Sequence, residues 1–407
     1  MSEVRNVPRL RFPEFHGNWS LIDIKDVFSI LNGYAFSSSD SQEKGVKWVK
    51  IADVGVGKMV HKNVSYLPES FLSNHKKFIL KKGDFVVALT RPILSGKLKI
   101  SPIDDYYHNS LLNQRVGKIE TKNESVFIYN LLRTNRLINT IENNINGSEP
   151  PNLSPSTLNG IKVDIPSLPE QQKIADFLTA VDKRIELLEK KKNLLETYKK
   201  GVMKKIFNQE IRFKDDNGND FPVWREMKLG NVLTEYISKT KVNNQHDVLS
   251  STIEKIYRQS EYFNHQVASK DNTGYKVLKL NQLVFSPQNI WMGNINVNTE
   301  FEKGIVSPSY KIYDFKPGYD YMYFKDFLKQ PKMLFEYTQS SEQGASVVRR
   351  NLNLKLFLSI PIKVPSLDEQ IKISNFLSSI DNQIERLDTQ IDKSKSWKKG
   401  LLQKMFV

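Results

Sequence analysis

Two segments of the chain carry hydrophobic residues at alternating steps of four and three positions, with charged and polar residues between them. The first series is Ile174, Leu178, Val181, Ile185, Leu188 and Leu195, and the second is Ile373, Leu377, Ile380, Ile384, Leu387 and Ile391. Lys192 and Ser394 occupy positions of the two series that are otherwise hydrophobic. This spacing is typical of a helix that buries one seam against another helix. The pattern therefore predicts two long helices that form a coiled coil.

The two segments are copies of one another. Residues 166–207 align with residues 365–406 without a gap, and 18 of 42 positions are identical. A weaker match opens each half of the chain, where Arg11, Phe12, Trp19, Ile24 and Val27 correspond to Arg212, Phe213, Trp224, Leu229 and Val232. A helix of about 40 residues is roughly 60 Å long, more than the core of one domain needs. We therefore expect a duplicated chain whose two helices act as spacers and run antiparallel.

Polar residues at the start of each copy predict how the helices begin. Ser167 is followed three residues later by Glu170, and Ser366 and Glu369 repeat this spacing. At this spacing, each side chain can accept a hydrogen bond from the backbone N–H of the other residue. Near the far end, Gly201 and Gly400 each cost about 1 kcal/mol in a helix interior. We expect the helix to end or bend at these glycines, or another surface to approach them closely.

The segments between the copies have a mixed pattern of short strands and helices. Strand-like runs include residues 46–54, 85–89 and 283–286, and a helix is predicted for residues 125–143. Its counterpart begins near Asp320, and Pro331 should kink or break it. The predicted fold is α+β with a pseudo-two-fold repeat. It has two mixed α/β domains at residues 1–165 and 211–364 and spacer helices at residues 166–210 and 365–407.

Composition adds a preference for an anionic partner. The chain has 60 Lys and Arg residues against 45 Asp and Glu residues, and its net charge is +15. Such a charge favours DNA, RNA or an acidic membrane surface, although lysine-rich usage alone could also produce it. The absence of cysteine excludes disulfides and cysteine-based zinc sites. No apolar run of 18 residues and no secretory leader are present, so we expect a cytoplasmic protein.

Candidate contacts to DNA lie after predicted strands in both halves, where Arg, Lys, Asn and Gln could reach bases or phosphates. For each residue alone, an ordinary solvated surface position is the alternative. The residues of the first half are Arg91, Lys97, Lys99 and Arg115, together with Gly147 and Ser148 in a small polar loop. Those of the second half are Arg258, Gln288, Asn289, Trp291, Lys311, Arg349 and Arg350, together with Gly344 and Ser346 in the matching loop.

Catalytic signatures are missing from the sequence. There is no phosphate-binding loop of the GxxxxGK[ST] type, and the six histidines are scattered singly, so we predict no metal site. No glycine-rich cofactor loop follows a first strand, and the Asn-Pro-Pro-aromatic motif of an amino-methyltransferase is also missing. We therefore predict no catalytic residue in this chain, and expect any enzymatic activity to come from partner proteins.

The repeated helix, with its P-S-L-x-E-Q start and its later F-L, D and I-E-x-L, closes each half and follows an Asn-Leu pair at residues 152–153 and 351–352. In these features the chain resembles the specificity subunits of Type I restriction-modification systems. The resemblance covers essentially the whole chain. It implies two target-recognition domains that each read one half of an asymmetric, bipartite double-stranded DNA site. It also implies two methyltransferase subunits around the helical spacer and motor-nuclease subunits in the restriction complex. S-adenosylmethionine, ATP and Mg²⁺ would then belong to those partners, and this chain would hold no cofactor.

Two other functions remain open at this point. A coiled-coil adaptor with an incidental basic surface would bind proteins and select no DNA sequence. A nuclease with an unfamiliar site would cleave DNA in the presence of a metal without any partner. Recognition domains vary freely within the resembled family, so the contact residues above rest on composition and position alone.

Overall fold

A computed structural model of the chain describes residues 6–62, 64–145, 150–262, 269, 271–346 and 349–407. The side chains of residues 343–349 are also outside this description. The chain divides into two compact units, which are described separately here. Unit 1 comprises residues 1–190 and 387–407, and unit 2 comprises residues 191–386. Each unit therefore contains the beginning of one long helix and the end of the other. The four-part division expected from the sequence stays a prediction.

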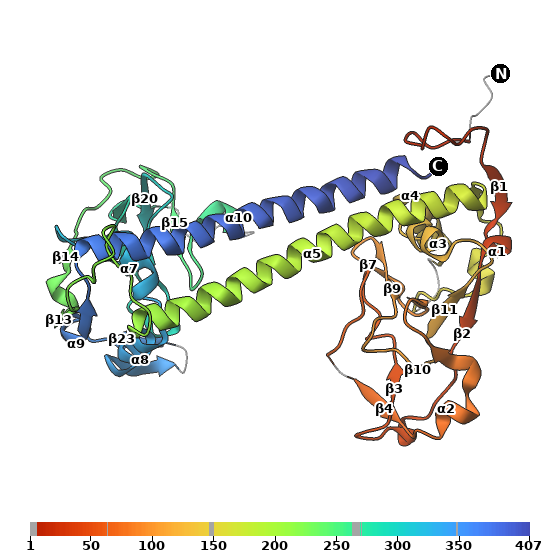
Figure 1. The fold of residues 1–407 in the computed structure, drawn as a ribbon, viewed down its shortest axis with the longest axis horizontal. Coiled ribbons are helices and arrows are strands. Elements are labelled where there is room, and N and C mark those ends of the chain that lie inside the picture. Colours follow the sequence, from red (N-terminus) through yellow and green to blue (C-terminus); the bar gives the residue numbers. More distant parts are fainter. Residues whose placement is uncertain (1–5, 63, 146–149, 263–268, 270, 347–348) are drawn as a thin grey trace. The chain divides into compact units, whose positions relative to one another are not determined.

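Unit 1 is built from short strands with a few helices beside them (Figure 1). Its main sheets are the four-stranded sheets β2-β11-β6-β9 and β4-β3-β10-β5, and β1 pairs antiparallel with β12. The strands are β1 (Ser20–Asp23), β2 (Ser29–Asn32), β3 (Val46–Val49), β4 (Ser65–Leu67), β5 (Ile79–Leu80), β6 (Phe85–Ala88), β7 (Ile93–Leu94), β8 (Lys97–Leu98), β9 (Ile100–Pro102), β10 (Ser110–Leu112), β11 (Val116–Glu120) and β12 (Lys162–Ile165). The helices are α1 (Ile24–Val27), α2 (Phe71–Asn74), α3 (Ser125–Leu131) and α4 (Asn135–Ile145), with 3-10 turns η1 (Ser38–Asp40), η2 (Lys76–Phe78) and η3 (Pro155–Leu158).

Unit 2 repeats part of this arrangement. Its four-stranded sheet has the order β14-β21-β18-β19, and β13 pairs antiparallel with β24. The strands are β13 (Arg225–Lys228), β14 (Leu233–Glu235), β15 (Leu249–Ser251), β16 (Ile256–Arg258), β17 (Lys276–Lys279), β18 (Leu283–Phe285), β19 (Ile295–Val297), β20 (Lys303–Val306), β21 (Lys311–Phe315), β22 (Ser341–Ser346), β23 (Arg349–Leu352) and β24 (Pro361–Val364). The helices are α6 (Gln259–Tyr262), α7 (Tyr321–Phe327), α8 (Pro331–Gln339) and α9 (Leu354–Ser359), with 3-10 turns η4 (Leu229–Asn231) and η5 (Ile290–Met292).

The duplication extends from the long helices into the sheets. In each unit a strand that follows the buried tryptophan pairs with the strand that precedes the long helix, as β1 with β12 and β13 with β24. The sheets β2-β11-β6-β9 and β14-β21-β18-β19 also have matching strand order and antiparallel pairing. Trp19 and Trp224 are buried at equivalent places in the two cores. The α+β fold with a repeated framework is thus confirmed.

One local expectation about the short helices needs correction, and another is confirmed. The single helix predicted for residues 125–143 is two helices, because α3 ends at Leu131 and α4 begins at Asn135. Thr134 lies in the intervening turn, and its hydroxyl donates to the carbonyl of Leu131. In unit 2 the expected break at Pro331 is confirmed, since Pro331 occupies the first turn of α8, where its missing N–H costs nothing.

The repeated segments form the long helices α5 (Leu168–Phe207) and α10 (Leu367–Lys404). Within each unit they run antiparallel (Figure 1). In unit 1 the end of α10, through Leu401, Met405 and Phe406, joins the core that contains the start of α5. In unit 2 the end of α5, through Ile206, joins the core that contains the start of α10. Each core is therefore incomplete without the far end of the other helix.

The predicted seam residues are buried or partly buried in the structure. Ile174, Leu178, Val181 and Ile185 belong to the core of unit 1, and Ile373 and Leu377 belong to that of unit 2. Ile380, Leu387 and Ile391 are also buried, whereas Leu188, Leu195 and Ile384 are partly exposed. In α5 the seam residues that follow Ile185 are thus more exposed than those in the core of unit 1, whereas in α10 only Ile384 is partly exposed.

Two ion pairs fasten the helices at equivalent places. In unit 1 Lys398 of α10 binds the carboxylate of Asp182 on α5. In unit 2 Lys199 of α5 binds Asp381 of α10 at 2.7 Å. The offset of 199 residues relates Asp182 to Asp381 and Lys199 to Lys398, so the two pairs are the same contact made twice. Lys398 is mostly buried, and this burial lowers its pKa.

The glutamates at the helix starts have a different role from the predicted cap. Glu170 accepts two hydrogen bonds from Arg11, at 2.7 and 2.8 Å, and one from the indole of Trp19. Glu369 is bound in the same way by Arg212 and Trp224, although its own N–H also donates to Ser366 at 3.5 Å. Both carboxylates are buried. A hydrogen bond between a carboxylate and an arginine is stronger than one to a neutral backbone N–H, so each glutamate binds its arginine and not the backbone N–H of the serine at the predicted capping box. Each glutamate thus ties the segment that opens its unit to the start of a long helix, and we call these two sets of contacts the Glu170 clip and the Glu369 clip.

Gly201 and Gly400 lie inside the helices, which continue to Phe207 and Lys404. A Cβ atom added at either glycine would meet nothing within 4 Å, so the expected close approach of another surface is wrong. We expect Gly201→Ala and Gly400→Ala each to raise the free energy of unfolding by about 1 kcal/mol. Chemical denaturation would measure this. Gly33→Ala is the matched control and should destabilise, because its Cβ would lie 2.2 Å from the carbonyl oxygen of Asn113.

Candidate nucleic-acid interface

In unit 1 the predicted contact residues gather at one end of the sheet β2-β11-β6-β9. Arg91 follows β6, and its backbone N–H donates to the carbonyl of Pro151 at 2.8 Å. Arg115 precedes β11, and its carbonyl accepts from the N–H of Leu89 at 3.0 Å. Because β6 and β11 are antiparallel, the end of one lies beside the start of the other. The structure thus brings Arg91 and Arg115, both exposed, to the same end of the sheet.

The two lysines between β6 and β9 differ in their surroundings. Lys97 is exposed at the tip of the β7-β8 hairpin, where Ser95 and Gly96 have positive φ values of 50° and 68°. The ammonium of Lys99 instead donates to the carbonyl of Ile51 at 3.0 Å, and its burial lowers its pKa. Lys97 is therefore available to a ligand, whereas Lys99 already holds the Ile51 segment in place.

Sequence reasoning missed an aromatic residue at this end of the sheet. Tyr34 follows β2, its N–H donates to Leu112, and its carbonyl accepts from Gln114. Tyr34 is 43% exposed, and its ring packs against Phe36, His75 and Phe78. The only local signal was the preceding Gly33, whose backbone lies too close to Asn113 to admit a side chain. A partly exposed aromatic residue at the same sheet end as two arginines suits contact with a nucleic acid, because bases stack on aromatic side chains.

In unit 2 the corresponding connection, between β18 and β19, carries Gln288, Asn289 and Trp291. Backbone hydrogen bonds from Asn289 to Ser286 and from Asn294 to Asn289 close this loop around η5. Gly293 ends η5 with a φ of 96°, a conformation that favours glycine. Gln288 is exposed and Asn289 is partly exposed, so the loop presents two amide side chains at the sheet end that matches the Arg91 end of unit 1.

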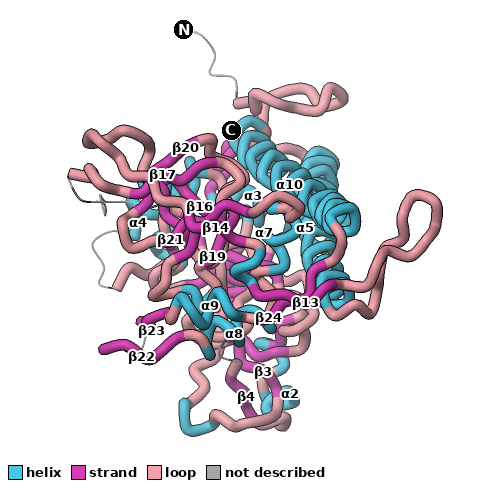
Figure 2. The backbone as a smooth tube through the Cα atoms, turned by 90° about the vertical axis from the view of Figure 1, so that its left-hand side faces the viewer, coloured by secondary structure: helices cyan, strands magenta, loops and turns pink. Residues whose placement is uncertain are grey.

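The hairpin β22-β23 joins this loop. The N–H of Arg350 donates to the carbonyl of Gln288 at 3.3 Å, and its guanidinium lies 4.8 Å from the ring centre of Trp291. Figure 2 shows the two strands beside α8. Gly344 and Ser346, predicted in a loop, instead lie in β22, and Arg349 begins β23, with a register shift between Gln343 and Ser346. The loop prediction failed here because strand pairing satisfies these backbone groups. Gly147 and Ser148 lie outside the described residues.

Two other predicted residues are neutralised by carboxylates. Lys311, at the start of β21, donates to Glu235 at 2.6 Å. Arg258 in β16 binds both Asp247, at 3.0 Å, and Glu261, at 3.2 Å. A cation that already faces one or two carboxylates gains less from a phosphate, because the local charge is balanced. Lys311 and Arg258 thus differ from Arg350, whose guanidinium contacts an aromatic ring and not a carboxylate among the described side chains.

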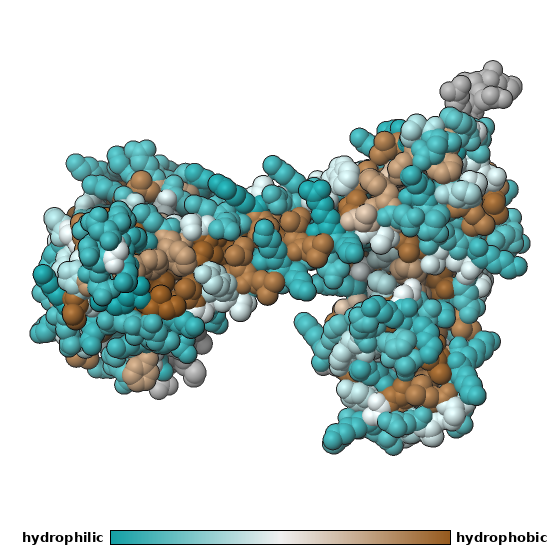
Figure 3. Space-filling view, viewed as in Figure 1, coloured by the Kyte–Doolittle hydropathy of each residue, from teal (hydrophilic) through white to brown (hydrophobic). Residues whose placement is uncertain are grey.

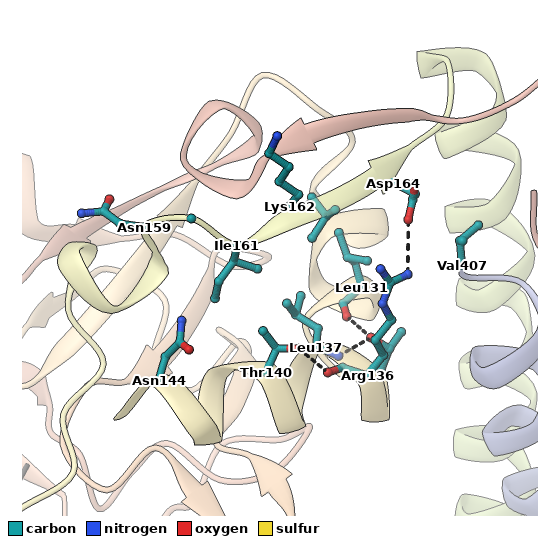
Figure 4. A pocket seen from close by; sticks show the side chains of 13 residues that line it. Leu131, Arg136, Leu137, Thr140, Asn144, Asn159, Ile161, Lys162, Asp164 and Val407 are labelled. Atoms are coloured by element: carbon teal, nitrogen blue, oxygen red, sulfur yellow. Dashed lines mark hydrogen bonds and ion pairs between the residues drawn. The ribbon is translucent and has the colours of Figure 1, made fainter. Parts of the chain in front are cut away.

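The pockets offer no better candidate. One, of about 410 Å³, lies between α4 and β12 in unit 1 (Figure 4). Its polar lining includes the ion pair of Arg136 with Asp164 at 3.2 Å. The other carboxylate oxygen of Asp164 is buried with no hydrogen-bond partner among the described residues. Another, of about 300 Å³, includes Lys329, whose ammonium donates to Ile253, Glu254 and Asn296. Burial lowers the pKa of Lys329 to about 8.

The described part of the chain contains neither a cluster of metal ligands nor a helix that could span a membrane. No group of three or more His, Asp or Glu residues there could hold a metal ion. No helix in the same residues is long and apolar enough to cross a membrane. Among the described residues, the two matching sheet ends carry the candidate contacts, with Arg and Tyr in unit 1 and Gln, Asn, Trp and Arg in unit 2.

Comparisons with known proteins give a consistent family. Residues 16–197 match the Type I restriction modification DNA specificity domain. The MjaVIII specificity subunit of Methanocaldococcus jannaschii is 34% identical over 53% of this chain and 51% of that protein. The EcoAI specificity subunit of Escherichia coli is 28% identical over 46% of this chain and 31% of that protein, so the chain spans about half or less of these two relatives. The EcoBI specificity subunit of Escherichia coli is 25% identical over 93% of this chain and 82% of that protein.

Solved structures have the same fold. The S subunit of a Type I restriction-modification system from M. genitalium matches with a TM-score of 0.58 and 17% identity, over 98% of this chain and 99% of that one. A chain from a Type I restriction-modification assembly matches with a TM-score of 0.53 and 16% identity, over 95% and 97%. At such low identity these structures support the fold alone. Residues 16–197 thus match the family of the Type I restriction modification DNA specificity domain, and the chain as a whole is similar in sequence and in fold to Type I restriction enzyme specificity subunits.

Proposed function

We propose that this chain is the sequence-specific DNA-binding subunit of a Type I restriction-modification complex and has no catalytic role of its own. Each unit would read one half of an asymmetric, bipartite site. The observation that carries the proposal is that the two units share the same structural framework but have different side chains at the matching ends of their sheets. The Glu170 and Glu369 clips and the two helix ion pairs repeat, whereas the matching sheet ends carry different side chains. Two different readers on one framework suit two different half-sites.

Other subunits would supply the chemistry. Within unit 2 the long helix α5 exposes Leu194 and Tyr198 by 61% and 54%. Their spacing of four residues places them on the same side of the helix. Figure 3 shows that hydrophobic residues are also visible on the surface along the long helices. Such a stripe supports docking of protein partners, which we propose are two methyltransferase subunits and, in the restriction complex, motor-nuclease subunits. S-adenosylmethionine, ATP and Mg²⁺ would bind to them.

Selection from random DNA duplexes tests the proposal. The chain would be purified with its methyltransferase subunits, and the bound duplexes would be sequenced. We expect enrichment of one bipartite motif, and long-read methylation sequencing of expressing cells should reveal the same motif. Enrichment of no sequence would instead favour the coiled-coil adaptor. Metal-dependent cleavage of DNA by the chain without partners would instead favour the alternative that the chain is a nuclease.

Exchanging one reader should change one half of the site. Residues 211–364 hold the second reader and lie between the two repeated helices. Replacing them with the equivalent segment of another specificity subunit should alter one half-site and leave the other half-site and the spacing unchanged. Long-read methylation sequencing would measure this. A change in both half-sites would show that the two units do not read independently.

Lengthening both helices should lengthen the spacer of the site. Seven residues inserted after Lys190 and seven after Arg386 keep the hydrophobic seam in phase and add about 10 Å to each helix. Because B-DNA rises about 3.4 Å per base pair, we expect the spacer to grow by about three base pairs. The half-sites themselves should stay the same. Methylation sequencing that found an unchanged spacer would show that the helices do not set the separation.

A further inference from the structure

Unit 2 holds one arginine on an aromatic platform. The guanidinium of Arg350 lies 4.8 Å from the ring centre of Trp291, within the range of a cation–π contact. The platform is fixed, because η5 is closed by Gly293 and the neighbouring Ile290 is fully buried. The indole nitrogen of Trp291 is itself buried with no hydrogen-bond partner among the described residues. The indole N–H therefore lies inside the fold, and one face of the ring supports the guanidinium.

The backbone fixes the arginine from the other side. The N–H of Arg350 donates to the carbonyl of Gln288, which ties β23 to the loop after β18. Within the side chains that the structure describes, Arg350 has no carboxylate partner, unlike Arg258 and Lys311. A cation–π contact leaves most of the five N–H donors of a guanidinium unused, so the Arg350 side chain can still donate to a second ligand. Those groups match two adjacent acceptors in one plane.

We propose that Arg350 is a specificity-determining residue that reads a guanine in the half-site of unit 2, with Trp291 as its positioning residue. The O6 and N7 atoms of guanine form such an acceptor pair in the major groove, and arginine is their commonest partner. The inference rests on the proposed DNA-binding function. Pro151 stands at the position of unit 1 that is equivalent to Arg350. The contact therefore belongs to one half-site only.

A phosphate also offers two acceptors, and base analogues separate it from guanine. The probe is the duplex that methylation sequencing identifies, bound by the chain with its methyltransferase subunits. Each guanine of the unit 2 half-site would be replaced in turn by 7-deazaguanine, which lacks N7, or by hypoxanthine, which keeps O6 and N7. We expect 7-deazaguanine at one position to weaken binding about 10-fold. Hypoxanthine at the same position should have little effect.

The variants identify the residue responsible. In Arg350→Ala the 10-fold penalty for 7-deazaguanine should disappear, and in Arg350→Lys, which keeps the charge but not the two-pronged guanidinium, the penalty should be smaller. Trp291→Leu should reduce that penalty while binding to non-specific DNA stays the same. Arg225→Ala is the matched control, because it removes another exposed arginine, in β13, and should keep the full penalty. Thermal unfolding of each variant would show that unit 2 still folds.

Several outcomes would overturn the inference while the proposed function stands. The unit 2 half-site could contain no required guanine, or Arg350→Ala could keep the 7-deazaguanine penalty. A uniform loss across all sequences, with a smaller salt dependence, would assign Arg350 to a phosphate. Failure of the chain to select any bipartite motif would instead overturn the proposed function itself. The two failures are therefore distinguishable in the same experiment.

Discussion

Glu369→Ala is expected to lower the free energy of unfolding of unit 2 by about 3–5 kcal/mol, because it removes the fully buried carboxylate of a hydrogen-bonded ion pair. Glu369 is fully buried and accepts hydrogen bonds from Nε and Nη2 of Arg212, at 3.1 and 2.7 Å, and from the indole of Trp224 at 3.1 Å. The contact with Glu369 also raises the pKa of Arg212. Without the carboxylate, the partly exposed guanidinium of Arg212 would lose its ionic partner and the buried indole N–H of Trp224 would lose its acceptor.

Thermal unfolding followed by calorimetry would measure the change. For a unit of this size, 3–5 kcal/mol corresponds to a fall of roughly 6–20 °C in the unfolding temperature of unit 2. Glu369→Gln should cost less, because its amide oxygen can still accept from Trp224. Glu300→Ala is the control, since it removes an exposed carboxylate from its pair with Lys255 in the same unit and should cost less than about 1 kcal/mol. Equal effects of the two alanine variants would contradict a structural role for the clip.

The clip also marks where sequence reasoning reached its limit. The alternating steps of four and three residues predicted both long helices correctly, because a seam is a local pattern along one element. The same local reasoning assigned Glu170 to a cap, and the structure gives it to Arg11, 159 residues away in sequence. Only the duplication could have indicated this contact. Arg11, Trp19 and Glu170 of the first half all recur in the second half, as Arg212, Trp224 and Glu369.

The candidate interface shows a similar division. Sequence position after a strand selected Gln288, Asn289 and Trp291 together, and they do share one loop. Whether a basic residue is free or neutralised depends on partners far along the chain, as for Lys311 and Glu235, which are 76 residues apart. Composition cannot separate Arg350, held on a ring, from Arg258, held between two carboxylates. That distinction requires the three-dimensional arrangement.

A chain shortened to residues 1–210 is expected to form a homodimer. The core of unit 1 needs the end of α10, and the equivalent residues at the end of α5 offer nearly the same side chains. Leu401, Met405 and Phe406 correspond to Val202, Ile206 and Phe207, and Lys398 corresponds to Lys199. A second copy can therefore complete the core with the end of its own α5. Light scattering should give twice the mass of the shortened chain. If the proposed function holds, its complex with methyltransferase subunits should methylate a palindrome of the unit 1 half-site.

A charge exchange tests whether this dimer uses the contact seen in the full chain. In the homodimer Asp182 of each copy should bind Lys199 of the other, as Asp182 binds Lys398 here. Lys199→Asp would place two carboxylates together at both ends and should weaken dimerisation at least about 10-fold, since like charges so close repel strongly. Asp182→Lys added to Lys199→Asp restores opposite charges and should recover the dimer. A double variant that stays monomeric would show that the shortened chain associates through another surface. Recovery would show that the end of α5 can replace the end of α10 in the core of unit 1.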